Sequence, residues 1–220
     1  MNRSKSNTIT DPAPESLLES RWFVAMVVIT QSILWLPTRM VAPLFVRKSQ
    51  SLWQPTHINR DRPLIISSNH QCRMDHFLVL SSLPWRAYFK LMPYRFFTAN
   101  DLFFFPLNII LLLCGSFPAF QHKRLPYGLR VAEQLLLKSQ TIFIFPEGKR
   151  SPWRGRPARS GVAVLAQNVD CDILPASVLW HKRGWIRQCS VVIGQPVSAQ
   201  NLTAQKILDL SFKLGKHHRI

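Results

Sequence analysis

Residues 64–80 read LIISSNHQCRMDHFLVL, and the order of polar and apolar side chains predicts a strand, a turn and a helix. The short apolar run Leu64–Ser68 predicts a buried strand that ends at Asn69 and His70. Residues 74–83 repeat apolar side chains at helical spacing and stop before Pro84, so they predict a helix. A strand that passes through a short turn into a helix is typical of α/β domains.

The alternation of strands and helices continues along the chain. Residues 141–145 (TIFIF) predict a second buried strand, which a turn at Pro146, Glu147 and Gly148 follows. Further strands are predicted at residues 87–91, 173–175 and 190–193, and further helices at 127–138, at 162–167 and after 201–203. We therefore expect an α/β fold with a mainly parallel central sheet flanked by helices.

An apolar segment precedes this alternation. Residues 22–36 (WFVAMVVITQSILWL) predict a helix that ends at Pro37. At about 1.5 Å per residue, this helix is shorter than a hydrocarbon core of about 30 Å. Three placements stay open: packing within the protein, insertion into one leaflet with Trp22 and Trp35 at the interface, or a tilted span. We expect an N-terminal helical membrane anchor.

Charge and hydropathy exclude several classes of protein. The chain has 28 Lys and Arg against 11 Asp and Glu, a formal charge of +17, yet 47% of its 220 residues are hydrophobic. This hydrophobic content excludes a disordered chain, and the small number of long apolar runs excludes a polytopic membrane protein. The composition fits one globular domain that attracts anionic surfaces.

The cysteines and histidines show no pattern of metal ligands. The four cysteines (Cys72, Cys114, Cys171 and Cys189) form no CxxC pair, and the seven histidines form no HExxH motif. We therefore expect no metal site. The sequence has no evident cleavable signal peptide, and free thiols favour a reducing, cytosolic-side location.

A histidine and an aspartate stand at the turn after the first strand. On one continuous helix, side chains five positions apart point about 140° apart, so His70 can meet Asp75 only from a preceding turn. The predicted turn supplies this arrangement. A carboxylate that accepts the Nδ1–H of histidine fixes the tautomer and leaves Nε2 as a general base. The alternative is a histidine that only satisfies a carboxylate at a helix start.

A basic loop follows the strand at residues 141–145. Lys149 and Arg150 stand where ligands of α/β sheets bind, at the carboxyl ends of the strands. Both side chains offer hydrogen-bond donors to phosphate, and arginine can donate two parallel bonds. The basic run continues at Arg154, Arg156 and Arg159. The alternative is a solvated basic loop.

Together, NHxxxxD at residues 69–75 and FPEGxRS at residues 145–151 strongly resemble the glycerolipid acyltransferase family, typified by the 1-acyl-sn-glycerol-3-phosphate acyltransferases. The resemblance covers about residues 58–196. It extends to Lys90, to Gly115, to the turn at 159–161 and to the run at 173–175. Four blocks in the family's order form a more specific signal than either motif alone.

The resemblance implies direct acyl transfer without an acyl-enzyme. By analogy with the family, His70, oriented by Asp75, deprotonates a hydroxyl of a lysolipid, whose oxygen attacks an acyl thioester. The co-substrate is acyl-CoA or acyl carrier protein, and no cofactor is needed. The resemblance also implies a set of substrate-binding residues, in which Asn69 holds the turn and Arg150 binds phosphate: Asn69, Lys90, Glu147, Gly148, Lys149 and Arg150.

Three positions depart from the family pattern. Cys72 and Lys149 stand where the family usually carries serine and threonine. Gln121 stands where it carries a basic residue, and residues 122–124 (His, Lys, Arg) follow directly. The sequence is therefore compatible with a lysolipid other than lysophosphatidate, or with an acceptor that lacks glycerol.

A second long apolar block, residues 102–120 (LFFFPLNIILLLCGSFPAF), has no charged side chain. Pro106 and Pro118 argue against a plain spanning helix. The block either packs against the sheet as core, or in part lines an acyl-chain groove or dips into lipid. Both interpretations stay open.

These observations predict an O-acyltransferase that esterifies a lysophospholipid at the cytoplasmic face of the inner membrane. We expect residues 1–50 to form a tail and a membrane-associated helix, and residues 51–220 to form the acyltransferase domain. The expected partners are membrane lipids and acyl-CoA or acyl carrier protein, with no nucleic acid. Two alternatives stay open: a non-catalytic, basic lipid- or nucleic-acid-binding protein on the same scaffold, and a thioesterase.

Overall fold

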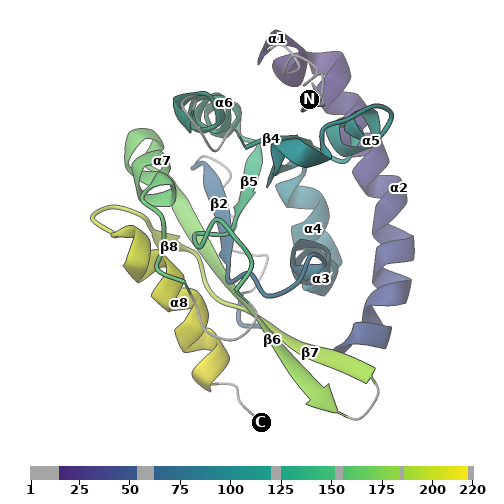
Figure 1. Cartoon of the computed structure of the whole chain (residues 1–220), viewed down its shortest axis with the longest axis vertical. Helices are drawn as coiled ribbons and strands as arrows, with labels where there is room; N and C mark the ends of the chain where they lie inside the picture. The colour runs from purple at the N-terminus through teal and green to yellow at the C-terminus, as the bar shows by residue number, and fades with distance from the viewer. Residues whose placement is uncertain (1–14, 54–61, 120–124, 152–155, 184–185, 218–220) are drawn as a thin grey trace, which may run out of the picture.

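The computed structural model (Figure 1) describes residues 15–53, 62–119, 125–151, 156–183 and 186–217. Its strands are β1 (Val46–Ser51), β2 (Leu64–Ser68), β3 (Tyr94–Thr98), β4 (Ser116–Pro118), β5 (Thr141–Ile144), β6 (Asp172–Arg183), β7 (Ile186–Ile193) and β8 (Val197–Ser198). Its helices are α1 (Glu15–Glu19), α2 (Arg21–Phe45), α3 (Asp75–Ser82), α4 (Trp85–Leu91), α5 (Leu107–Leu113), α6 (Leu125–Leu137), α7 (Gly161–Val169) and α8 (Ala204–His217), and residues Asn100–Leu102 form the 3₁₀ turn η2.

The strands form one sheet in the order β1-β7-β6-β2-β5-β3-β4, and β8 pairs with β6. The pairs β2–β5, β2–β6, β3–β5, β3–β4 and β1–β7 are parallel, whereas β6 pairs with β7 and β8 in antiparallel fashion. The prediction of a mainly parallel sheet is therefore confirmed. Because β2 and β5 run in the same direction, the residues that follow them emerge at the same edge of the sheet.

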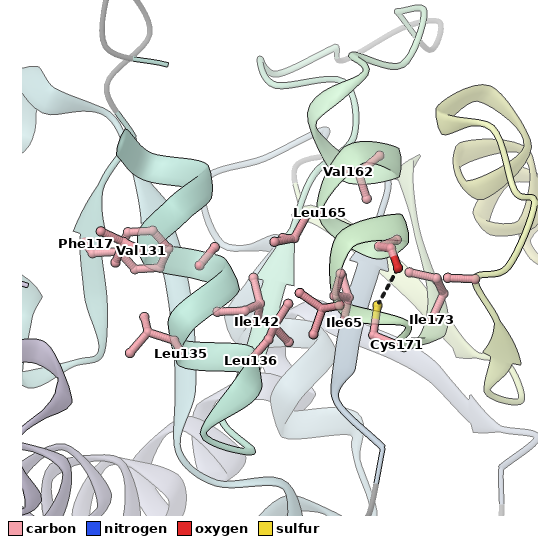
Figure 2. Packing of buried hydrophobic residues seen from close by; sticks show 14 of the residues in the cluster. Ile65, Phe117, Val131, Leu135, Leu136, Ile142, Val162, Leu165, Cys171 and Ile173 are labelled. Atoms are coloured by element: carbon pink, nitrogen blue, oxygen red, sulfur yellow. Dashed lines mark hydrogen bonds between the residues drawn. The ribbon is translucent and has the colours of Figure 1, made fainter. Parts of the chain in front are cut away.

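Helices cover both faces of the sheet (Figure 1). On one face, α6, α7 and α8 pack over Ile65, Ile142 and Ile173, and Figure 2 shows this cluster. On the other face, α3 and α4 pack over Ile66 and Phe143. Consecutive residues of β2 thus point to opposite faces, which explains why the predicted strand is an unbroken apolar run.

Two predicted elements are wrong. Residues 87–91 form part of helix α4, and the strand β3 follows only at Tyr94. The spacing of buried Ala87, Tyr88 and Leu91 is helical, but a short apolar run alone does not distinguish a helix from a strand. The second error is the predicted end of the first long helix at Pro37, because α2 continues to Phe45.

Tertiary contacts carry α2 past Pro37. The hydroxyl of Thr38 donates to the carbonyls of Leu34 and Trp35 at 2.8 and 2.9 Å. At the next residue, the guanidinium of Arg39 donates to the carbonyls of Ser81 and Leu83 at the end of α3. These bonds hold the turn after the proline, which itself removes one backbone donor.

A buried amide ties the middle of α2 to the sheet. The Gln31 side chain donates to the carbonyls of Tyr94 and Cys114, and it accepts the Tyr94 N–H at 3.0 Å. The predicted domain boundary at residue 50 lies inside β1, which pairs with β7. The division into 1–50 and 51–220 stays a prediction, and residues 1–14 lie outside the described part of the chain.

The block at residues 102–120 contains η2, α5 and β4 rather than one long helix. Phe117 is buried in the core, whereas Phe105 is 74% exposed and Ile110 is also exposed. The core interpretation therefore applies to Phe117, and the groove or lipid interpretation of the exposed part stays a prediction. Phe117 packs as core, and the residues around α5 present apolar side chains to the surface.

Candidate active site

The turn between β2 and α3 is held to the sheet by Asn69. Its side-chain amide donates to the Val178 carbonyl at 2.8 Å and accepts the Val178 N–H at 2.8 Å. The side chain thus makes the two hydrogen bonds that the backbone of a paired strand residue would make. Asn69 is buried, and its amide needs both bonds to stay satisfied. This contact supports the predicted role of Asn69 in holding the turn.

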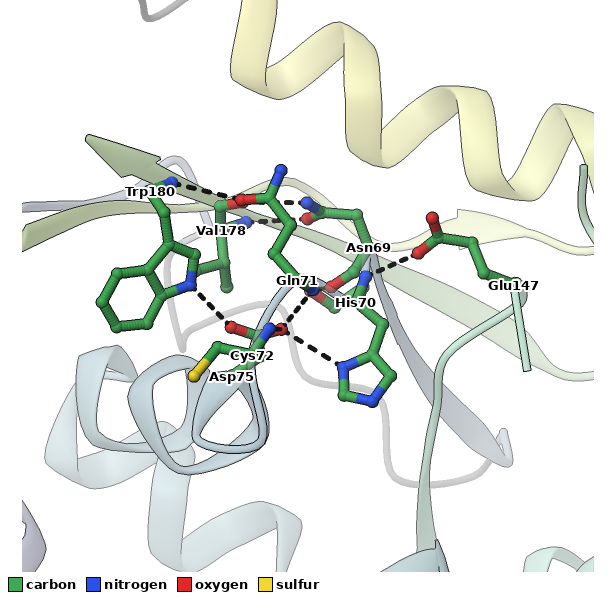
Figure 3. A network of polar contacts seen from close by, with 9 residues as sticks. Asn69, His70, Gln71, Cys72, Asp75, Glu147, Val178 and Trp180 are labelled. Carbon is green, nitrogen blue, oxygen red and sulfur yellow. Dashed lines mark hydrogen bonds and ion pairs between the residues drawn. The ribbon is translucent and has the colours of Figure 1, made fainter. Parts of the chain in front are cut away.

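His70 and Asp75 meet across the turn (Figure 3), with Nδ1 of His70 at 3.2 Å from Oδ2 of Asp75. The same oxygen accepts the backbone N–H groups of Gln71 and Cys72 at 2.6 Å each. Asp75 is 0% exposed, whereas 17% of the His70 side chain is exposed. The buried carboxylate orients the ring, and Nε2 points away from Asp75 (Figure 3). This nitrogen is therefore placed to accept a proton as a general base.

The Cys72 departure does not alter this pair. The contact with Asp75 comes from the backbone N–H of Cys72, which serine would provide equally. Asp75 is also the first residue of α3, where a carboxylate is stabilised by the positive end of the helix. The sequence therefore keeps the His–Asp geometry despite the change of side chain.

A strand remote in sequence completes the surroundings of Asp75. The indole N–H of Trp180, on β6, donates to Oδ1 of Asp75 at 2.9 Å. The backbone N–H of Trp180 donates to Oε1 of Gln71 at 3.2 Å. Neither the role of Trp180 nor that of Gln71 could be predicted from the sequence, because no local motif connects residues more than a hundred positions apart.

Glu147 joins the two motifs. One carboxylate oxygen accepts the His70 N–H at 2.6 Å, and the other accepts the Arg156 N–H at 3.3 Å. Burial raises the pKa of Glu147, while the hydrogen bonds from these two backbone groups lower it. In the structure Glu147 thus binds backbone groups of the protein, and its predicted contact with the acceptor stays a prediction.

Lys149 and Arg150 lie beside His70. Glu147 accepts the His70 N–H, and the Ser151 N–H donates to the His70 carbonyl at 2.7 Å, so both ends of the loop are fixed at His70. Lys149 and Arg150, between them, are exposed. The loop therefore presents two cations that can donate to phosphate on the same side of the sheet as His70.

Gly148 makes the turn of this loop possible. Its φ of +65° is disfavoured for other residues, and an added Cβ would lie 2.7 Å from Cδ of Arg159. The Arg159 side chain therefore lies over Gly148, and a further cation stands beside Lys149 and Arg150. Phe145, just before the loop, stacks on the His70 ring with 3.9 Å between centroids.

The topology places Lys90 away from this site. Lys90 lies near the end of α4, which leads into the amino end of β3. Because β3 runs parallel to β5, and β5 parallel to β2, Lys90 lies near the amino ends of these strands, whereas His70 lies at their carboxyl ends. Gln121, residues 122–124 and Arg154 lie outside the described ranges.

Within the described ranges, no group of three or more His, Cys, Asp or Glu side chains could hold a metal ion. The described cysteines, Cys72, Cys114, Cys171 and Cys189, are free thiols. The buried carboxylates Asp75 and Glu147 accept hydrogen bonds from donors of the protein itself. The absence of a cofactor stays a prediction.

His76, next to Asp75, is predicted to make stability sensitive to acid. Its ring lies among Phe77, Phe96 and Phe143, and burial lowers the pKa of His76 to about 4. Below about pH 6.5, His76 is protonated in the unfolded chain but stays neutral in the folded protein. The free energy of unfolding therefore falls between pH 6.5 and 4. Between pH 7.5 and pH 4.5, the free energy of unfolding should therefore fall in both proteins, but by about 2–3 kcal/mol less in His76→Phe than in wild type.

Urea unfolding at the two pH values measures this difference. Wild type and His76→Phe are measured under the same conditions, so the difference between them isolates the side chain at position 76. An equal loss of stability in wild type and His76→Phe would contradict the assignment.

Comparison with known proteins now defines the class. Residues 51–179, more than half of the chain, match the protein-family model described as Acyltransferase. The chain belongs to the Acyltransferase family and is an acyltransferase, so the family and enzyme class predicted from the sequence are confirmed.

Among solved structures, the chain resembles the crystal structure of the 1-acyl-sn-glycerophosphate (LPA) acyltransferase, PlsC, from Thermotoga maritima. The TM-score is 0.60 at 18% sequence identity, and the match covers 85% of this chain and 79% of that chain. This likeness confirms the predicted fold. A comparison with curated proteins gave no match.

Proposed function

We propose that the protein transfers an acyl group from acyl-CoA or acyl carrier protein to a hydroxyl of a lysophospholipid. The observation that carries this proposal is the His70–Asp75 pair, which stands directly beside the exposed cations Lys149 and Arg150. An enzyme that acylates a phosphorylated alcohol needs a base for the hydroxyl and a surface that binds the phosphate. The Thermotoga maritima structure, named for 1-acyl-sn-glycerophosphate, supports this acceptor class.

The proposed reaction needs one base. Nε2 of His70 takes the hydroxyl proton of the acceptor, while Asp75 stabilises the imidazolium that forms. The acceptor oxygen bonds to the carbonyl carbon of the thioester, and the carbon–sulfur bond then breaks. The leaving thiolate takes the proton from Nε2, which restores neutral His70 and releases the thiol.

The acceptor phosphate is proposed to bind at the loop of residues 147–151. Arg150 offers two parallel donors to phosphate, and Lys149 adds a point charge where threonine is usual in the family. Arg156 and Arg159 are also exposed on the continuation of this loop. The buried carboxylates Asp75 and Glu147 point into the protein rather than toward this surface.

We also propose that the protein binds the membrane through α2 and the residues around α5. Among described helices, α2 is long and apolar enough to cross a membrane by length and composition alone. Many of its exposed side chains are apolar, with Ile33 68% and Met40 72% exposed. Yet Gln31 and Arg39 bond the other side of α2 to the domain, which favours a helix lying in one leaflet over a span.

Membrane binding by this surface is predicted to depend on Ile33. Ile33→Glu removes an exposed apolar side chain and adds a charge, so we expect vesicle partitioning to fall about 10- to 100-fold. Sedimentation with vesicles of phosphatidylcholine and phosphatidylglycerol measures it. Val164→Glu, at an exposed position of α7, which lies on the opposite side of the molecule from α2 in Figure 1, is the matched control. Equal partitioning of the two variants would contradict this placement.

We propose further that the membrane is the inner membrane and that the protein binds its cytoplasmic face.

An acceptor panel tests the proposed function. Purified protein is given a labelled acyl-CoA or acyl carrier protein with lysophosphatidate, other lysophospholipids or monoacylglycerol. We expect the lysophospholipids to yield a diacyl product and monoacylglycerol, which lacks phosphate, to yield little. Equal use of monoacylglycerol would contradict the role of the cations at residues 149 and 150.

A further inference from the structure

We infer that Trp180 is a positioning residue, which holds the Asp75 carboxylate in the orientation that the His70 base requires. The inference rests on the acyl transfer proposed above. Trp180 lies on β6, and its indole N–H donates to Oδ1 of Asp75 at 2.9 Å (Figure 3). It contacts no reacting atom in this scheme, so any effect on the reaction passes through Asp75.

The two oxygens of Asp75 have different partners. Oδ2 faces Nδ1 of His70 and the backbone N–H groups of Gln71 and Cys72, all within its own turn. Oδ1 faces the indole of Trp180, which comes from another element. Because the carboxylate is 0% exposed, bulk water does not replace the indole. Donors on both oxygens oppose rotation of the carboxylate, so Oδ2 stays directed at His70.

β6 holds the turn at several points. The backbone of Val178 pairs with the Asn69 amide, and the backbone N–H of Trp180 donates to Gln71. Backbone groups of residues two apart on a strand point to the same side of that strand, so the backbones of Val178 and Trp180 both face the turn. The indole bond to Asp75 extends this set of contacts from the backbone of the turn to the carboxylate that orients the base.

Loss of the indole N–H should affect the rate rather than binding. Without it, Oδ1 is left buried without this donor, and the carboxylate is free to turn away from His70. Lys149 and Arg150 lie on a different loop, held through Glu147 and Ser151, so acceptor binding should persist. For Trp180→Phe we expect kcat to fall about 10- to 100-fold, with the acceptor KM within about two-fold of wild type.

Trp53→Phe is the matched control. Trp53 is 4% exposed, and its indole nitrogen has no hydrogen-bond partner within the described part of the chain. Both substitutions remove the same atoms from a half-buried or buried ring, but only Trp180→Phe removes a hydrogen bond. The control should therefore keep kcat within about two-fold of wild type. An equal loss of kcat in both variants would overturn the inference.

A double-mutant cycle separates positioning from a merely structural role. Trp180→Phe is combined with Asp75→Asn, in which the carboxylate is already lost. If Trp180 acts through that carboxylate, its substitution should cost less than about three-fold in the Asp75→Asn background. The same 10- to 100-fold cost in both backgrounds would show a structural role and overturn the inference.

A second readout needs no substrate. We expect the Nδ1 proton of His70, which faces Asp75, to give a proton NMR signal at low field, to be assigned by its loss in His70→Ala. We expect this signal to move or broaden in Trp180→Phe and to stay in place in Trp53→Phe. An unchanged signal in Trp180→Phe would overturn the inference. Failure of wild type to acylate any lysolipid would refute the proposed function alone, and the NMR comparison would still decide the role of Trp180.

Discussion

Acyl transfer by His70→Ala is expected to fall by about 10²–10⁴-fold, the usual cost of removing a general base. In the structure, Nδ1 of His70 is held by Asp75 while Nε2 points away from it, so alanine removes the atom proposed to take the acceptor's proton. Steady-state acyl transfer with a labelled thioester measures the loss. Activity above a few per cent of wild type would refute the assignment of His70 as the base.

Stability should change little in His70→Ala. Asp75 keeps its donors from Gln71, Cys72 and Trp180, so the buried carboxylate is not left without hydrogen bonds. Thermal unfolding therefore serves as the control for folding. His181→Asn, which removes a histidine that lies on β6 and bonds to Ser190, should retain wild-type activity.

Gly115→Ala is expected to lower the free energy of unfolding by about 3 kcal/mol or more. Gly115 has φ of +94°, and an added Cβ would lie 2.2 Å from the Tyr94 carbonyl oxygen and 2.7 Å from Nε2 of Gln31. Neither neighbour can move easily, because Gln31 holds α2 to Tyr94 through the same atoms. The substitution thus disturbs the sheet and the attachment of α2 together.

Gly161→Ala is the matched control for this second prediction. At the start of α7, an added Cβ would meet the Leu129 side chain at 3.5 and 3.9 Å, which is ordinary van der Waals contact. We expect its stability to equal wild type or to rise by less than about 1 kcal/mol. Urea unfolding compares the variants, and an equal small change in both would contradict the role given to Gly115.

The local parts of the site could be predicted from the sequence because they depend on short-range geometry. The strand at Leu64–Ser68, the turn and the helix that follows place His70 beside Asp75 from adjacent residues alone. The parallel sheet then brings the loop with Lys149 and Arg150 to the same edge, since β2 pairs with β5. The resemblance to the family added the chemistry that this pair would perform.

The remaining features depend on contacts that no local pattern shows. Trp180 and Val178 reach the turn from β6, across more than a hundred residues of sequence. Helix α2 passes Pro37 because Arg39 finds acceptors at the end of α3, against the local preference of proline. Lys90 matched a family position, yet the strand directions place it near the amino ends of the parallel strands, away from His70 at their carboxyl ends.

The most direct test follows thiol release and product formation in the same reaction. Purified wild type is mixed with labelled acyl-CoA, with and without lysophosphatidate, and free thiol, diacyl product and free fatty acid are quantified together. Direct transfer to a lysophospholipid predicts thiol release only with the acceptor, in equal amounts with the diacyl product, and no acyl group left on the protein. Thiol and fatty acid released at the same rate without acceptor would instead show a thioesterase and contradict the account.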